Sequence, residues 1–109
     1  MKFMITWHER SMGSAADYEG LQKRIMAVFK GWKIPESVKV HHFLVRAGDW
    51  GGFMLVETDD VAAMHKMSST YPAFEFRVDP VLDIQDAVAA QLDAMGWLDS
   101  IPSLQSRAA

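Results

Sequence analysis

The stretch that decides the fold runs from Val38 to Asp60 and reads VKVHHFLVRAGDWGGFMLVETDD. Two runs rich in β-branched and aromatic residues flank a short break, Ala-Gly-Asp-Trp-Gly-Gly. This pattern is typical of an antiparallel hairpin, because β-branched and aromatic side chains favour strands and glycine favours tight turns. We therefore predict one strand over about residues 38–46 and a second over about residues 52–58.

The pairing of these two strands decides which polar side chains share a face. If Arg46 pairs with Gly52, then His41 lies opposite Glu57. A slip of one residue would bring His42 opposite Glu57 instead, because neighbouring residues of a strand point to opposite faces. The first register is our prediction, and it makes His41 and Glu57 the candidate pair for chemistry.

On either side of the hairpin, the spacing of apolar residues predicts further elements. Alternation indicates strands over residues 2–9 and 74–78, and recurrence every three to four residues indicates helices. The first helix is predicted to begin after Ser14, because Ser14 and Asp17 resemble a capping box. It is predicted to end near Gly31, where a glycine suits the end of a helix.

Two more helices follow the hairpin. The second is predicted to begin at Asp59 or Asp60 and to end before Pro72. The third is predicted between Asp83, which caps it, and Gly96, which closes it.

The resulting order, β-α-β-β-α-β-α, is that of a ferredoxin-like α+β fold. Right-handed crossovers place the strands in one antiparallel sheet, in the order 4-1-3-2, with the first two helices on one face. A chain of 109 residues makes one domain. We predict a ferredoxin-like α+β barrel domain with its C-terminal helix over residues 1–96, and a docked turn and tail over residues 97–109.

The composition excludes several classes of function. The net charge of −3 and the lack of a basic stripe argue against a nucleic-acid partner. No run of eighteen apolar residues indicates a membrane span, and no apolar signal core precedes the first strand. Because there is no cysteine, a thiolate nucleophile is impossible. The cytoplasm is the expected location.

The sheet face turned away from the helices, here called the open face, carries the candidate ligand site. Its predicted members are Met4, Thr6, His8, His41, Phe43, Val45, Phe53, Leu55, Glu57, Glu75, Arg77 and Asp79. The hairpin residues predicted to face the helices are Val40, His42, Leu44, Met54 and Val56. Because monomers rarely expose so large an apolar patch, we expect a homodimer whose two sheets pack face to face around a partly polar cavity. A small organic ligand in that cavity and an interface without a ligand both fit the sequence.

Three stretches of the chain resemble a known family. They are KFMITW at the start, VKVHHFLVR followed by GGFMLVETDD, and FEFRVDPVLDIQDAV. The chain resembles an uncharacterised bacterial domain-of-unknown-function family within the dimeric α+β barrel superfamily. His41 matches a histidine often seen in this pattern, whereas His42 stands where glutamine is commoner. The resemblance implies the ferredoxin-like fold and a barrel dimer, and it implies no activity.

If the cavity is catalytic, its residues favour proton transfer without a bound cofactor. His41 would act as the base and Glu57 would set its tautomer, which suits isomerisation or oxygenation of an activated carbon on a small aromatic or carboxylated substrate. A cross-strand polar pair without a catalytic role is the alternative for these two residues. The remaining ligand-binding candidates are Thr6, Phe43, Phe53 and Arg77.

The four histidines do not predict a metal site. His41 and His42 point to opposite faces of a regular strand, His8 lies on the order of 10 Å from His41, and His65 lies on a helix. Two alternatives to an enzyme remain from the sequence. One is a non-catalytic binding or assembly module, and the other is a haem-binding barrel with histidine as the axial ligand.

Overall fold

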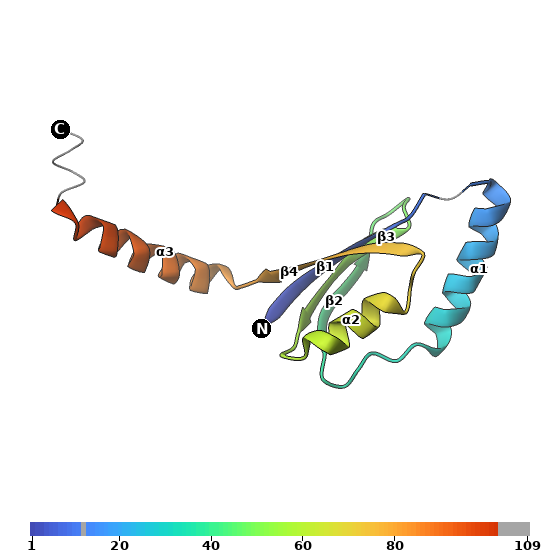
Figure 1. Ribbon diagram of the computed structural model, residues 1–109, viewed down its shortest axis with the longest axis horizontal. Helices are drawn as coiled ribbons and strands as arrows, with labels where there is room; N and C mark the ends of the chain where they lie inside the picture. The colour runs from blue at the N-terminus through green and yellow to red at the C-terminus, as the bar shows by residue number, and fades with distance from the viewer. Residues whose placement is uncertain (12, 103–109) are drawn as a thin grey trace.

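The computed structural model describes residues 1–11 and 13–102, and it forms one sheet with three helices (Figure 1). The elements are β1 (Lys2–Glu9), α1 (Ala15–Gly31), β2 (Lys39–Val45), β3 (Gly51–Glu57), α2 (Val61–Ser69), β4 (Phe74–Val81) and α3 (Ile84–Asp99). Neighbouring strands are antiparallel in the order β2-β3-β1-β4. This confirms the predicted α+β element order and sheet order of a ferredoxin-like fold.

The core lies between the sheet and the first two helices. Phe3, Ile5 and Trp7 of β1 are buried toward α1 and α2, and Phe74 of β4 is buried beside them. These are the side chains that alternation assigned to the helix side. Burying an apolar side chain of this size stabilises the fold by roughly 1.5–3 kcal/mol.

The predicted starts of α1 and α2 are confirmed. The Ser14 hydroxyl accepts a hydrogen bond from the backbone N–H of Asp17, and the Asp17 carboxylate accepts one from the backbone of Ser14. These bonds satisfy amide groups that a helix start leaves without partners. Asp60 caps α2 by accepting from the backbone N–H of Ala63 at 3.1 Å.

The predicted cap of α3 is wrong in its chemistry. Asp83 stands at the N-cap position, but its side chain makes no capping hydrogen bond. Its carboxylate instead accepts a hydrogen bond from Nζ of Lys2 at 2.9 Å, and this ion pair raises the pKa of Lys2. The contact ties the start of α3 to the start of β1.

The hairpin depends on two glycines. Gly48 in the turn has φ of 80°, a left-handed conformation that favours glycine. Gly52 lies so close to β2 that a Cβ atom would collide with the carbonyl oxygen of Leu44. The Ala-Gly-Asp-Trp-Gly-Gly break is therefore required both for the turn and for close strand approach.

The predicted hairpin register is wrong by one residue. Val45, not Arg46, pairs with Gly52, and Phe43 pairs with Met54. The register then shifts by a β-bulge between Val40 and His42, so that His41 is the extra residue.

This register changes the face of four β2 side chains. Phe43 and Val45, predicted on the open face, turn toward the helices, while His42 and Leu44 lie on the open face. The physical reason is aromatic packing: the Phe43 ring contacts Trp7 edge-to-face, with ring centroids 5.3 Å apart.

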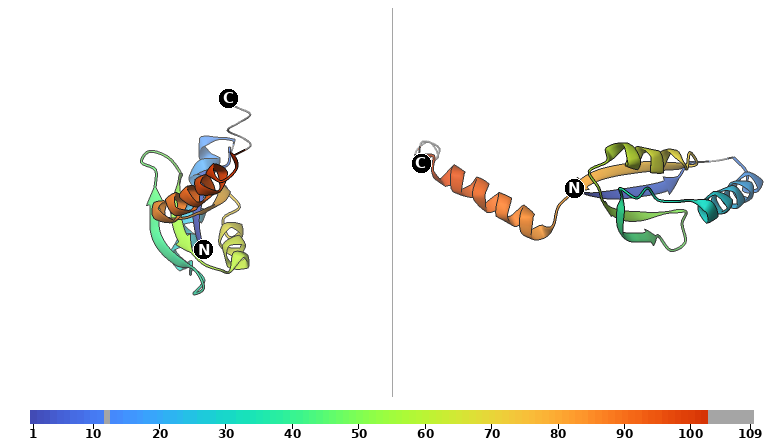
Figure 2. Two further views of the ribbon diagram at one scale, coloured as in Figure 1. Left: turned by 90° about the vertical axis from the view of Figure 1, so that its left-hand side faces the viewer. Right: turned by 90° about the horizontal axis from the view of Figure 1, so that it is seen from below.

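The third helix is longer than predicted and stands apart from the rest of the fold. It continues through Gly96 to Asp99, because Gly96 does not adopt the left-handed conformation that would end a helix there. Trp97, expected in a docked turn, is helical and 65% exposed. The right-hand view of Figure 2 shows α3 pointing away from the sheet. Residues 103–109 of the predicted tail lie outside the described residues.

Among the described residues, none of the helices combines the length and apolar character that crossing a bilayer requires.

Candidate functional site

The predicted contact between His41 and Glu57 is present. Nε2 of His41 lies 2.8 Å from Oε1 of Glu57, although Glu57 pairs in the ladder with Lys39. The predicted register placed His41 directly opposite Glu57, whereas in the structure the β-bulge turns the His41 side chain toward Glu57. The hydrogen bond with His41 lowers the pKa of Glu57, so this carboxylate is held ionised.

Three of the predicted ligand-binding residues form a row across the middle of the open face. Thr6 of β1 lies between Phe53 of β3 and Arg77 of β4. Arg77 is already paired, since its Nε lies 2.9 Å from Oδ2 of Asp79 on the same strand. The guanidinium of Arg46 lies 5.6 Å from the centroid of the Phe53 ring, where it makes a cation–π contact.

The structure does not bring the predicted residues together into one site. Glu57 is four residues along β3 from Phe53, which corresponds to roughly 13 Å at the rise of a strand. The His41–Glu57 pair therefore lies at one end of the open face, away from Thr6 and Arg77. Phe43 lies on the other face of the sheet.

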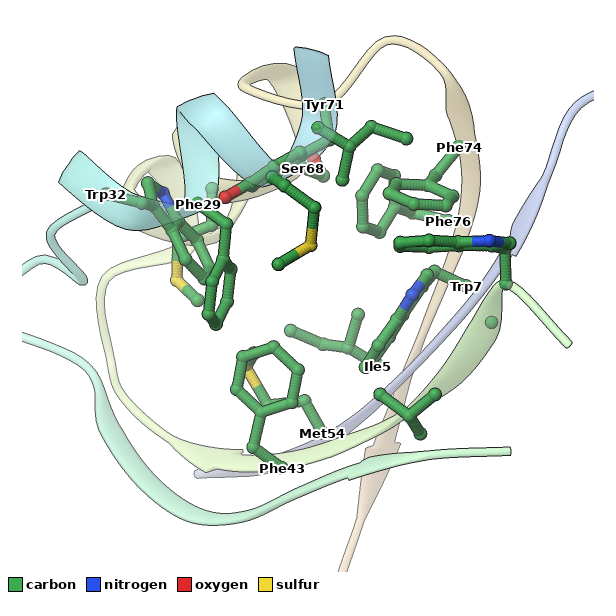
Figure 3. Close-up of a pocket in the computed structure, with 16 residues that line it drawn as sticks. Ile5, Trp7, Phe29, Trp32, Phe43, Met54, Ser68, Tyr71, Phe74 and Phe76 are labelled. Carbon is green, nitrogen blue, oxygen red and sulfur yellow. The ribbon is translucent and has the colours of Figure 1, made fainter. Parts of the chain in front are cut away.

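A pocket lies on the helix side, where the sequence was interpreted only as core. It has a volume of about 210 Å³, lies between the sheet, α1 and α2, and is partly open to solvent (Figure 3). Its lining is almost wholly apolar and includes Ile5, Trp7, Met26, Phe29, Trp32, Phe43, Met54, Tyr71, Phe74 and Phe76.

Edge-to-face aromatic contacts build one wall of this pocket. The ring of Phe43 lies 6.1 Å from that of Phe29 and 6.4 Å from that of Trp32, nearly perpendicular to both. Trp32 in turn lies 5.1 Å from Tyr71. Such edge-to-face pairs stabilise the packing of the rings beyond the burial of their apolar area. The signal in the sequence was the aromatic end of α1, once Phe43 is placed on the same side.

Tyr71 is a lining residue that carries a polar group. The residue is buried, and its hydroxyl has no hydrogen-bond partner among the residues that the structure describes. Burial raises the pKa of Tyr71, so the phenol stays neutral and keeps its proton to donate. The hydroxyl of Ser68, also in the lining, already donates to the carbonyl of His65 at 3.0 Å.

A family model described as Domain of unknown function (DUF3303) matches residues 1–94. The chain belongs to this family. The match runs from β1 into α3 and confirms the resemblance to an uncharacterised family. No curated protein matches the chain.

The donor groups of this DUF3303 protein do not favour a metal or a haem. Within the described ranges, 1–11 and 13–102, no three His, Asp or Glu side chains are grouped so that they could hold a metal ion. The pocket lining contains no histidine, so it does not fit the histidine-ligated haem that the sequence left as an alternative. Nε2 of His8 lies 2.8 Å from Oε2 of Glu75 on the surface.

Proposed function

We propose that this protein binds a small, largely apolar organic molecule in the helix-side pocket. The observation that carries the proposal is the aromatic lining around about 210 Å³ of space. Well-packed cores leave few voids larger than a water molecule, whereas an apolar cavity of about 150 Å³ accommodates benzene. The volume therefore suits a single aromatic ring with short substituents.

The lining also indicates the polarity of the ligand. No lining residue carries a positive charge, so a carboxylate would lose its hydration without gaining a partner. The Tyr71 hydroxyl is buried and has no hydrogen-bond partner among the described residues. We propose that a shift of this side chain on ligand binding lets it donate one hydrogen bond, which favours a ligand with one neutral acceptor such as a carbonyl oxygen. Of the two substrate types that the sequence suggested, the aromatic type fits this pocket and the carboxylated type does not.

A titration with two ring compounds tests the proposal. Acetophenone has a neutral acceptor and benzoate has a charged one, and the two differ little in size. Trp7, Trp32 and Trp50 all line the pocket, so tryptophan fluorescence reports occupancy. We expect acetophenone to change the fluorescence saturably and to raise the Tm, and benzoate to do neither. No saturable response to acetophenone would contradict the proposal.

A matched pair of variants on α2 localises the binding. Ser68 lines the pocket, whereas its neighbour Ser69 is exposed and does not. Ser68→Leu adds three carbon atoms to the lining and should weaken acetophenone binding at least tenfold. Ser69→Leu should leave it within twofold of the wild type. Equal weakening by both variants would place the ligand elsewhere.

A second candidate function rests on the 2.8 Å contact between His41 and Glu57. We propose that, if the protein is an enzyme, this pair transfers a proton on the open face, with His41 as base and Glu57 holding its tautomer. The pair and the pocket lie on opposite faces of the sheet, so the two candidates are separable. His41→Ala should abolish any proton-transfer turnover and leave acetophenone binding unchanged.

We also propose that the protein is a homodimer. Leu44 is 58% exposed and Phe53 is 37% exposed on the open face, where Met4 and Leu55 lie beside them. A second copy of the chain would cover this apolar strip. Sedimentation at micromolar concentration tests the proposal, and a monomer at every concentration would contradict it.

A further inference from the structure

The third helix is amphipathic, and its apolar side is bare. Ile84, Val88, Leu92, Met95 and Leu98 recur at intervals of three or four residues and form one stripe along α3. Each is at least 46% exposed, and α3 contributes no buried residue to the part of the chain that the structure describes. The stripe therefore lacks a counterpart among residues 1–11 and 13–102.

The position of α3 explains why its own sheet does not cover the stripe. The helix leaves the end of β4 and extends the molecule to 67 Å in its longest dimension (Figures 1 and 2). The radius of gyration is 20.7 Å, against about 13 Å for a compact chain of this length. The ion pair between Lys2 and Asp83 fixes the start of the helix beside β1.

The open face is a surface of matching length and character. Met4, Leu44, Phe53 and Leu55 give its middle an apolar strip. A helix of 16 residues is about 24 Å long, and the eight residues of β1 span about 26 Å. The apolar strip occupies the middle of this length, between Lys2 and His8 at the two ends of β1. Within the residues that the structure describes, the helix stripe and this strip both lack an apolar cover.

We propose that two chains form a dimer about a two-fold axis and exchange their α3 helices, here called arms. The apolar stripe of each arm docks across the open face of the other chain. This proposal rests on the homodimer proposed above and names the surfaces that form it. The sequence suggested that the two sheets pack directly on each other. In the arm-exchanged dimer the α3 helices lie between the two sheets instead. Asp86 and Asp93 lie on the opposite side of α3 from the stripe, so docking leaves both carboxylates in water.

The buried area is sufficient for a stable dimer. If each of the five stripe side chains removes roughly 80 Å² from water, the two arms together remove on the order of 800 Å². The two sheet faces contribute a similar area. The sum exceeds the ~1,000 Å² that a specific interface needs.

A matched pair of α3 variants tests the arm. Leu92 lies in the stripe, whereas Ala90 is exposed about 160° around the helix. Both Leu92→Asp and Ala90→Asp place an aspartate in the middle of α3. We expect the wild type and Ala90→Asp to sediment as dimers at 10 μM and Leu92→Asp to sediment as a monomer, with circular dichroism showing that all three fold. A Leu92→Asp dimer would overturn the proposal.

Cysteine cross-linking tests which surfaces meet, since the chain has no cysteine of its own. Thr6 lies in the middle of the open face and Leu92 in the middle of the stripe. The double variant Thr6→Cys/Leu92→Cys should form a covalent dimer on oxidation, and each single variant should remain uncrosslinked. Cross-linking of Thr6→Cys alone would show that the two sheets face each other and would overturn the arm exchange.

The arm exchange and the ligand proposal can be tested independently, because all the residues that line the pocket belong to one chain. Acetophenone should bind Leu92→Asp as it binds the wild type. An arm-exchanged dimer that binds no acetophenone would refute the ligand proposal alone. A monomeric wild type that binds acetophenone would refute the homodimer and the arm exchange together, and would leave the ligand proposal standing.

Discussion

The two faces of the sheet differ in how their side chains are satisfied. On the helix side, aromatic rings contact one another around a pocket, and Tyr71 is a buried group without a hydrogen-bond partner among the described residues. On the open face, polar groups are paired, as with His41–Glu57 and Arg77–Asp79, and are partly or largely exposed to solvent. Alternate residues of the same strands thus build an apolar pocket on one side and paired polar groups on the other. The cavity side is where a ligand gains most from leaving water.

The largest effect should come from adding a side chain where β2 and β3 approach each other most closely. Gly52→Ala places a methyl group against the Trp7 ring and against the Leu44 carbonyl, which is backbone and cannot move without disturbing the pairing of β2 with β3. We expect a loss of about 3 kcal/mol or more in the free energy of unfolding, measured by urea denaturation.

Gly20→Ala is the control for that variant. A Cβ at Gly20, in the middle of α1, meets nothing within 4 Å. Alanine there should stabilise the protein by about 0.5–1 kcal/mol, because it restricts the unfolded chain and favours a helix. Similar costs at both glycines would contradict the close strand approach.

Two neighbouring residues of β2 test which face each side chain occupies. Phe43→Ala removes a ring that packs on Trp7 and Phe29, so we expect a loss of about 2–3 kcal/mol. Leu44→Ala should cost less than about 1 kcal/mol, because Leu44 lies on the open face and is 58% exposed. Both are measured by urea denaturation in the Leu92→Asp background, where the partner should be absent. The opposite order would restore the register predicted from sequence.

The smallest effect concerns pH and the open face. The folded state lowers the pKa of Glu57 below its ordinary value of 4.5, through the hydrogen bond with His41. The ionised form therefore stabilises the protein above that value, and this contribution is lost as the pH falls through the lower, folded-state pKa. Glu57→Gln should have a lower urea midpoint than the wild type at pH 6, and the difference should shrink toward pH 3. A difference that is constant with pH would contradict the pairing.

The element order and the faces of β1 and β4 could be predicted from sequence because local patterns determine them. Phe3, Ile5 and Trp7 alternate with polar or less buried residues. In a sheet covered by helices on one face, this alternation predicts that the three side chains face the helices. The start of α1 was equally local, since Ser14 and Asp17 satisfy each other. Contact between His41 and Glu57 was also predicted correctly, although by another route.

The register of β2, the pocket and the cap of α3 depend on contacts between distant residues, which local sequence patterns do not determine. A one-residue bulge at His41 moves Phe43 to the other face, and local pattern on β2 gives no sign of it, since apolar residues occupy both faces. The pocket followed from that shift and therefore was missed. Asp83 was expected to cap α3, but the ion pair with Lys2, 81 residues away, takes its carboxylate.

The most direct test of the central claim, that the ligand site lies on the helix side, is to record nuclear Overhauser effects between bound acetophenone and assigned side chains. The protons of the ligand should show contacts to the rings of Phe29 and Phe43. Contacts to Leu44 and Phe53 instead would place the ligand on the open face and contradict the account.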